Sequence, residues 1–329
     1  MGLNLNQYKR MKNIITFSTP GKVILSGEHS VVYGHPALVA SIDKRLYFSL
    51  SEKDFFNKKE DAKTEKIVKL TEKTVVSYLE ENKIAYHQKK YSFKIESEIP
   101  VGCGLGSSAA LAVAATAGFL KFLTGKEFSK EVINELAYQG ETYFHQNPSG
   151  VDNTASCFGG LIFYRKEFEF LKNISFFNFK IPTTFPLYLI DSGKPKENTK
   201  EMVKEVSEKY KKNPSFFENV FFDIEKTTKK MVLAIKEGNK NLFQEAILDN
   251  EIFLEILGVV SSKTKKLLQK LSSFGVGKIT GAGGKSKGSG FILFFAEKEK
   301  NLIDFLQKEK ISFFKLEIDS QGLYEKSKN

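Results

Sequence analysis

A glycine-rich stretch that runs into an apolar segment is the strongest chemical signal in the sequence. Residues 102–108 read Gly-Cys-Gly-Leu-Gly-Ser-Ser, and an alanine-rich apolar run up to residue 123 is typical of a buried helix. A glycine loop that opens onto a helix N-terminus leaves unpaired N–H groups around one point, at the positive end of the helix dipole. Such an arrangement binds phosphate.

The alternative for this stretch is a strand-to-helix turn whose glycines only allow close packing. The stretch lacks the Gly-Lys-Ser/Thr ending of a Walker A loop. Its Gly-x-Gly-x-Gly spacing also differs from the dinucleotide-binding fingerprint.

A second signal is an acidic residue on an apolar helix face. Residues 130–145 have helical spacing, and Ile133, Ala137 and Phe144 fall on one stripe. Glu141, eight residues after Ile133, falls on the same stripe. Burying an unpaired carboxylate is costly, so we expect a metal ion or a lysine beside Glu141. A partly exposed stripe with a solvated Glu141 is the alternative.

Asp152, Lys22 and His29 do not indicate a function when each is considered alone. Residues 147–153 form a turn by composition, and Asp152 taken alone reads as a turn acid or a helix N-cap. Taken alone, Lys22 reads as a surface lysine and His29 as a turn histidine. The four histidines lack zinc-type spacing, and no serine has a nucleophile-elbow pattern, so no hydrolase triad is predicted.

In order along the chain, four motifs resemble those of the mevalonate kinases, within the family of galacto-, homoserine, mevalonate and phosphomevalonate kinases. Residues 20–34 look like the first motif of that family and residues 100–109 like its phosphate loop. Residues 147–153 resemble the catalytic aspartate segment, and residues 278–290 the third, glycine-rich motif. Four ordered motifs are far more specific than any one of them.

The resemblance implies ATP-dependent phosphorylation of the primary hydroxyl of mevalonate, giving 5-phosphomevalonate in isoprenoid biosynthesis. It implies ATP and Mg²⁺ as cofactors, with Ser108 and Glu141 as the magnesium ligands. The residues that would hold the ATP phosphates are Pro100, Gly102, Gly104, Leu105, Gly106, Ser107, Ser108 and Ala109.

By the same resemblance, Asp152 would be the base that accepts the hydroxyl proton, with Lys22 near it as a second catalytic residue. Glu28 and His29, together with Lys22 and Asp152, would bind the acceptor. A lysine beside the reacting hydroxyl favours the alkoxide and helps to neutralise the transferring phosphoryl group.

The third motif departs from the family pattern. Residues 285–287, Lys-Ser-Lys, interrupt the run of glycines and make the loop longer and more basic, which leaves open how it packs against the phosphate loop. Lys285 or Lys287 either reaches the nucleotide phosphates or stays solvated. The lysine-rich residues 191–199 are expected to form a mobile flap over the acceptor.

Two rival functions stay open at this point. One is a sister kinase that acts on phosphomevalonate or on a sugar such as galactose. The other is a non-catalytic binding protein on the same fold. Intact Lys22, Glu141 and Asp152 argue against the second, because a degenerate copy would have lost one of them.

The composition is that of an ordinary globular protein, with 329 residues, 41% apolar and 27% charged. The net charge is +11, but the chain has only three arginines and its lysines are spread evenly, which is not the pattern of a nucleic-acid binder. Two cysteines without metal-ligand spacing suggest a reducing compartment. We find no signal peptide and no apolar run near the roughly 20 residues that span a bilayer, so we expect a cytoplasmic protein without membrane partners. A homodimer is left open.

The order of elements predicts an α+β fold. Strand-like segments cluster early, including separate short strands at residues 14–17, 22–25, 37–42 and 46–50, and helical segments come late with a β-α-β finish. We expect residues 1–184 to form an ATP-binding and catalytic domain, and residues 185–329 a domain that closes the acceptor site. The resemblance implies a ribosomal-protein-S5-like first domain and a ferredoxin-like second one.

Overall fold

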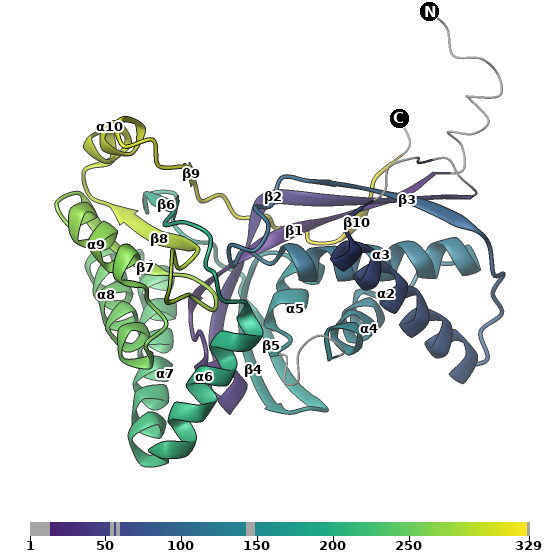
Figure 1. The fold of residues 1–329 in the computed structure, drawn as a ribbon, viewed down its shortest axis with the longest axis horizontal. Helices are drawn as coiled ribbons and strands as arrows, with labels where there is room; N and C mark the ends of the chain where they lie inside the picture. The colour runs from purple at the N-terminus through teal and green to yellow at the C-terminus, as the bar shows by residue number, and fades with distance from the viewer. Residues whose placement is uncertain (1–13, 53–55, 57–59, 143–148, 328–329) are drawn as a thin grey trace, which may run out of the picture.

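Two antiparallel sheets organise the structure, a computed structural model that describes residues 14–52, 56, 60–142 and 149–327, with the backbone alone at residues 141 and 142 (Figure 1). The larger sheet has the strand order β10-β1-β2-β4-β5, with β3 also paired to β2, and the smaller sheet has the order β7-β8-β6-β9. The larger sheet contains β1 (Ile15–Ser26), β2 (Ala37–Glu52), β3 (Tyr91–Ser97), β4 (Leu161–Phe168), β5 (Leu171–Phe176) and β10 (Tyr324–Glu325). The smaller sheet contains β6 (Leu187–Asp191), β7 (Gly275–Ile279), β8 (Phe291–Ala296) and β9 (Phe313–Lys315).

The helices form two groups along the chain. One group lies on one face of the larger sheet: α2 (Ala62–Glu81), α3 (Ser107–Thr124), α4 (Lys130–Thr142) and α5 (Val151–Phe158). The second half of the chain supplies α6 (Thr199–Lys212), α7 (Pro214–Glu237), α8 (Lys240–Leu257), α9 (Ser262–Leu271) and α10 (Glu299–Lys308). A short 3₁₀ helix, η1 (Ser30–Tyr33), links β1 to β2. This architecture is the α+β fold that the sequence predicts.

The first two strands are longer than the sequence suggests. The segments expected as separate strands at 14–17 and 22–25 form one strand, β1, and those at 37–42 and 46–50 form one strand, β2. The pairing of β1 with β2 shifts register between Pro20 and Gly21. A bulge tolerates a proline that cannot donate to the ladder. Residues 19–21, Thr-Pro-Gly, which separate the two expected strands in the sequence, therefore form a bulge within one strand.

Helix α3 is the central core element of the first half. Fourteen of its 18 residues are buried, and six of these are alanine, whose small side chain lets neighbouring elements approach closely. By length and composition alone, α3 could cross a membrane, which corrects the expectation that no apolar run comes near that length. In the fold, however, 78% of this window is buried inside the protein, as in the core helix of a globular protein.

The two halves of the chain are joined by more than the linker between β5 and β6. The last strand, β10, returns to the larger sheet and pairs with β1. The Thr280 side chain also donates to the carbonyl oxygen of Ile24 and accepts from its N–H, each at 3.0 Å. Thr280, which follows β7, therefore links the smaller sheet to β1. The division at residue 184 stays a prediction.

Candidate active site

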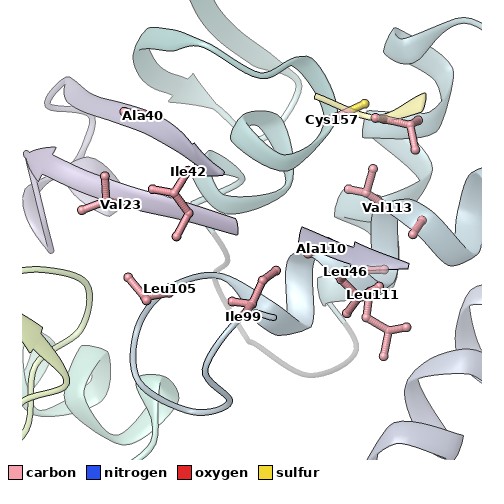
Figure 2. Close-up of a cluster of buried hydrophobic side chains, with 14 of the residues drawn as sticks. Val23, Ala40, Ile42, Leu46, Ile99, Leu105, Ala110, Leu111, Val113 and Cys157 are labelled. Atoms are coloured by element: carbon pink, nitrogen blue, oxygen red, sulfur yellow. The ribbon is translucent and has the colours of Figure 1, made fainter. Parts of the chain in front are cut away.

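The glycine loop between β3 and α3 is held to the core by apolar residues at both ends. Ile99 and Leu105 are almost fully buried, and Figure 2 shows Leu105 lying toward Val23 and Ile42 of the long strands. The N–H group of Lys22 donates to the carbonyl oxygen of Leu105 at 3.0 Å. These contacts fix the position of the loop while its glycines stay at the surface of the core.

The N–H groups of the loop are free to bind an anion. Among the described residues, no hydrogen bond to the chain is donated by the N–H groups of residues 104–109. The residue before α3, Gly106, has φ 79° and provides no side-chain cap. A long helix whose first N–H groups have no partner forms an anion site, which favours phosphate binding over a turn built only for packing.

Two of the loop glycines are required by close neighbours. A Cβ on Gly106 would lie 2.8 Å from Cγ of Lys22, and a Cβ on Gly104 would lie 3.1 Å from the carbonyl oxygen of Thr280. Both glycines also have positive φ, which other residues adopt only at a cost. The first and third motifs therefore pack directly on the phosphate loop.

Lys22 and Asp152 come together next to this loop. The Lys22 Nζ lies 2.9 Å from Oδ1 of Asp152, although the two residues are 130 positions apart in the sequence. The Lys22 side chain is 3% exposed, whereas the Asp152 side chain is 35% exposed. The pair thus offers a fixed ammonium group and a carboxylate that a small molecule can reach.

Asp152 owes its place to the start of α5. Gly150 precedes the helix with φ 81°, and a Cβ there would lie 2.7 Å from the Tyr164 hydroxyl. The next residue, Asn153, donates through Nδ2 to the backbone and side-chain oxygens of Asn134, at 3.1 and 2.8 Å, which ties α5 to α4. Asp152 is therefore presented from the first turn of a firmly held helix.

The third motif packs on the phosphate loop in spite of its interruption. A Cβ on Gly290 would lie 2.6 Å from the carbonyl oxygen of Cys103, and one on Gly281 would lie 3.2 Å from that of Gly104. The inserted residues turn instead toward α6 and the segment before it.

Acidic side chains on that side hold the inserted residues. Lys285 Nζ lies 2.6 Å from Oε2 of Glu205. The N–H groups of Lys285 and Ser286 and the Ser286 hydroxyl donate to Glu197, and these bonds lower the pKa of that carboxyl to about 2. Lys285 is thus engaged by α6, and a phosphate contact for Lys287 stays a prediction.

Glu28 and His29 are buried and carry polar atoms that lack partners. Oε1 of Glu28 forms an ion pair with Lys278, and among the described residues nothing bonds its Oε2. His29 Nε2 lies 3.1 Å from the carbonyl oxygen of Ala282, so it carries the proton. Burial lowers the pKa of His29 to about 4, so the ring is neutral and its unpartnered Nδ1 is an acceptor. Buried polar atoms without partners in the chain are satisfied by a bound water or by a ligand.

Sequence reasoning missed two buried residues behind this site, Lys278 and Glu251. Lys278 is fully buried on β7, and Glu251 is 7% exposed on α8, where its Oε2 accepts the N–H of Ile279 at 2.8 Å. The signal for Glu251 was the one used for Glu141, because Glu251 stands eight residues after the buried Phe243 on an apolar stripe.

The magnesium ligands implied by the resemblance are described only in part. Ser108 lies exposed in the first turn of α3, beside the free N–H groups. Glu141 lies in the last turn of α4, and its side chain falls outside the described residues. The Ser108 hydroxyl next to the free N–H groups fits Mg²⁺, which prefers oxygen ligands and shares them with substrate phosphates, and Glu141 as the second ligand stays a prediction.

Several kinases are similar to this chain in sequence and in fold. The model of the GHMP kinases N-terminal domain matches residues 68–160. The mevalonate kinase of Pyrococcus abyssi is 31% identical over 83% of this chain and 87% of its own, and that of Archaeoglobus fulgidus is 32% identical over 86% and 93%. Among solved structures, the mevalonate kinase of Methanococcus jannaschii has a TM-score of 0.73 at 24% identity, covering 92% of this chain and 98% of its own.

The structural likeness establishes the two-domain α+β architecture, and the sequence relatives go further. They exceed 30% identity over more than four fifths of the chain, and the region matched by the family model, residues 68–160, contains the glycine loop and Asp152. The chain therefore belongs to the family of galacto-, homoserine, mevalonate and phosphomevalonate kinases.

Proposed function

We propose that this protein is an ATP-dependent mevalonate kinase, which makes 5-phosphomevalonate for isoprenoid synthesis. The observation that carries the proposal is the Lys22–Asp152 pair at the edge of a loop with free N–H groups. Membership of the family implies ATP as the phosphoryl donor. Relatives above 30% identity are named mevalonate kinases, which favours mevalonate over the acceptors of sister kinases.

The phosphate loop positions ATP in this reaction. Its free N–H groups bind phosphate oxygens at the positive end of α3, so the outermost phosphate faces Lys22 at the Gly106 end. Phosphoryl transfer needs little covalent help from a protein, because alignment and charge neutralisation lower the barrier. Ser108 and Glu141 would hold Mg²⁺, which neutralises charge on the phosphate oxygens when bound.

Asp152 is suited to accept the proton of the attacking hydroxyl. Lys22 donates to Oδ1 of Asp152, which leaves Oδ2 on a side chain that solvent and substrate can reach. The same ammonium group stabilises the developing alkoxide and the transferring phosphoryl group. One lysine therefore serves the base, the nucleophile and the transferred group.

Glu28 and His29 are suited to orient the acceptor. A neutral His29 offers Nδ1 as an acceptor for a hydroxyl group, and Oε2 of Glu28 offers a second one. Mevalonate has two hydroxyl groups, so one can be bound while the other reacts. Three expectations stay predictions: that residues 185–329 close this site, that the protein is cytoplasmic, and that it forms a homodimer.

An acceptor screen tests the proposal. Purified protein is supplied with ATP and Mg²⁺, and ADP release is measured with mevalonate, 5-phosphomevalonate or galactose. We expect mevalonate to give a kcat/KM at least about a hundredfold above the others. Turnover with another acceptor alone would reassign the protein to a sister kinase, and binding of ATP without turnover on any acceptor would favour a non-catalytic protein.

A further inference from the structure

The turn that follows β6 is held against the third motif by several hydrogen bonds. Ser192 is 2% exposed, and its N–H and hydroxyl both donate to the carbonyl oxygen of Gly290, at 2.9 and 2.7 Å. Its hydroxyl oxygen accepts the N–H of Ser289 at 3.0 Å and the Thr264 hydroxyl at 3.1 Å. The N–H of Gly290 in turn donates to the carbonyl oxygen of Gly193 at 3.1 Å. These hydrogen bonds fix the backbone position of the residue that follows Gly193.

That residue, Lys194, reaches over the start of the phosphate loop. A Cβ on Gly102 would lie 2.8 Å from Cε of Lys194 and 3.2 Å from its Nζ. A side chain at position 102 would displace the end of the Lys194 side chain, and Gly102 also has a positive φ of 76°. The loop then has a lysine at each end, with Lys22 against Gly106 and Lys194 against Gly102.

The positive charge at the Gly102 end of the loop meets no neutralising carboxylate in the part of the chain that the structure describes. Among the described residues, Lys194 has no carboxylate within ion-pair distance, and a second lysine, Lys263, brings its Nζ to 3.2 Å from where a Cβ on Gly193 would lie. The one acid of the turn, Asp191, accepts the N–H of Gly193 at 2.8 Å. The Lys194 ammonium group at the start of the glycine loop, with a second ammonium group next to its turn, favours a bound anion.

We propose that Lys194 binds the phosphates that stay on the nucleotide, the β-phosphate above all, as a specificity contact of this chain. The proposal rests on the proposed function in placing ATP on this loop. Lys22 and Asp152 occupy the Gly106 end, where the transferred phosphoryl group lies, so the Gly102 end faces the phosphates left on ADP. The segment expected as a flap over the acceptor thus contributes a residue to the nucleotide side.

Calorimetric titration with ADP tests this contact without any acceptor. We compare the wild type with Lys194→Ala, Lys194→Arg and the matched control Lys200→Ala, which removes an exposed lysine from the first turn of α6. Lys194→Ala is expected to weaken ADP binding about tenfold, the loss for one charge-assisted contact, and to leave AMP binding unchanged. Lys194→Arg is expected to stay within about threefold of the wild type, since it keeps the charge.

Salt and stability measurements complete the test. The difference in ADP affinity between the wild type and Lys194→Ala should become smaller when NaCl is raised from 50 to 500 mM, because salt screens an exposed charge. The melting temperature of Lys194→Ala should equal that of the wild type. ADP binding by Lys194→Ala within about twofold of the wild type, or an equal loss for AMP, would overturn the proposal. A wild type that binds ADP through Lys194 but never phosphorylates mevalonate would refute only the proposed function.

Discussion

Glu251 is expected to make the stability of this protein depend on pH in a way that one substitution removes. It is buried on α8 near Glu28 and Lys278, with Glu255 on its own helix. Lys278 is engaged in its ion pair with Glu28, so two buried carboxyl groups share one ammonium group. Burial raises the pKa of Glu251 to about 8, and the charge of Lys278 does not offset it.

The sign and size of the effect follow from this pKa. The folded protein keeps a proton on Glu251 that the unfolded chain has already released above its ordinary pKa of 4.5. A raised pKa therefore adds stability at low pH, and this stability is lost as the pH rises from about 4.5 through about 8. At about 1.4 kcal/mol for each unit, the loss between pH 6 and pH 9 is about 2.5 kcal/mol.

Urea unfolding of Glu251→Gln at these two pH values measures the effect. Glutamine keeps an oxygen to accept the N–H of Ile279 but does not titrate. We expect the wild type to lose about 2.5 kcal/mol more than the variant between pH 6 and pH 9. Glu245→Gln, which removes an exposed acid from the same helix, is the control and should follow the wild type. Equal losses in wild type and Glu251→Gln would refute the reasoning.

Two further predictions concern the active site itself. Gly106→Ala places a Cβ 2.8 Å from Lys22, so steady-state kinetics should show a KM for ATP raised about tenfold or more and a lower kcat. Gly238→Ala has a similar φ of 67° with nothing within 4 Å, and should leave that KM unchanged; equal effects of the two would count against a role for the loop. Because the pKa of His29 is about 4, the ring stays neutral at ordinary pH, and the KM for mevalonate should show no step near pH 6.5 between pH 5.5 and 8. A step that His29→Gln abolishes would contradict this.

Much of the site could be predicted from short sequence patterns, because its motifs are local. The glycine loop, its helix and the α+β order of elements follow from spacing and composition, and the fold and family are confirmed by the relatives. The closeness of Lys22 to Asp152 followed only from the resemblance, since 130 residues separate the two.

Other features depend on tertiary contacts that no local pattern contains. The bulge at Pro20 lets β1 continue where two separate strands were expected, because β2 supplies the pairing on both sides. The inserted Lys285 turns away from the phosphate loop because Glu197 and Glu205, some 80 residues earlier, engage it and its neighbour. Lys194 gained its position through Ser192 and the third motif, and its sequence neighbours gave no sign of it.

The most direct test of the account is the kcat of Asp152→Asn with saturating ATP, Mg²⁺ and mevalonate. Asparagine keeps the size of the side chain and an oxygen for Lys22, but it cannot take the hydroxyl proton. The account predicts that kcat falls by about a thousandfold or more while the affinity for ATP stays within about threefold of the wild type. A variant that turns over mevalonate at the wild-type rate would contradict it.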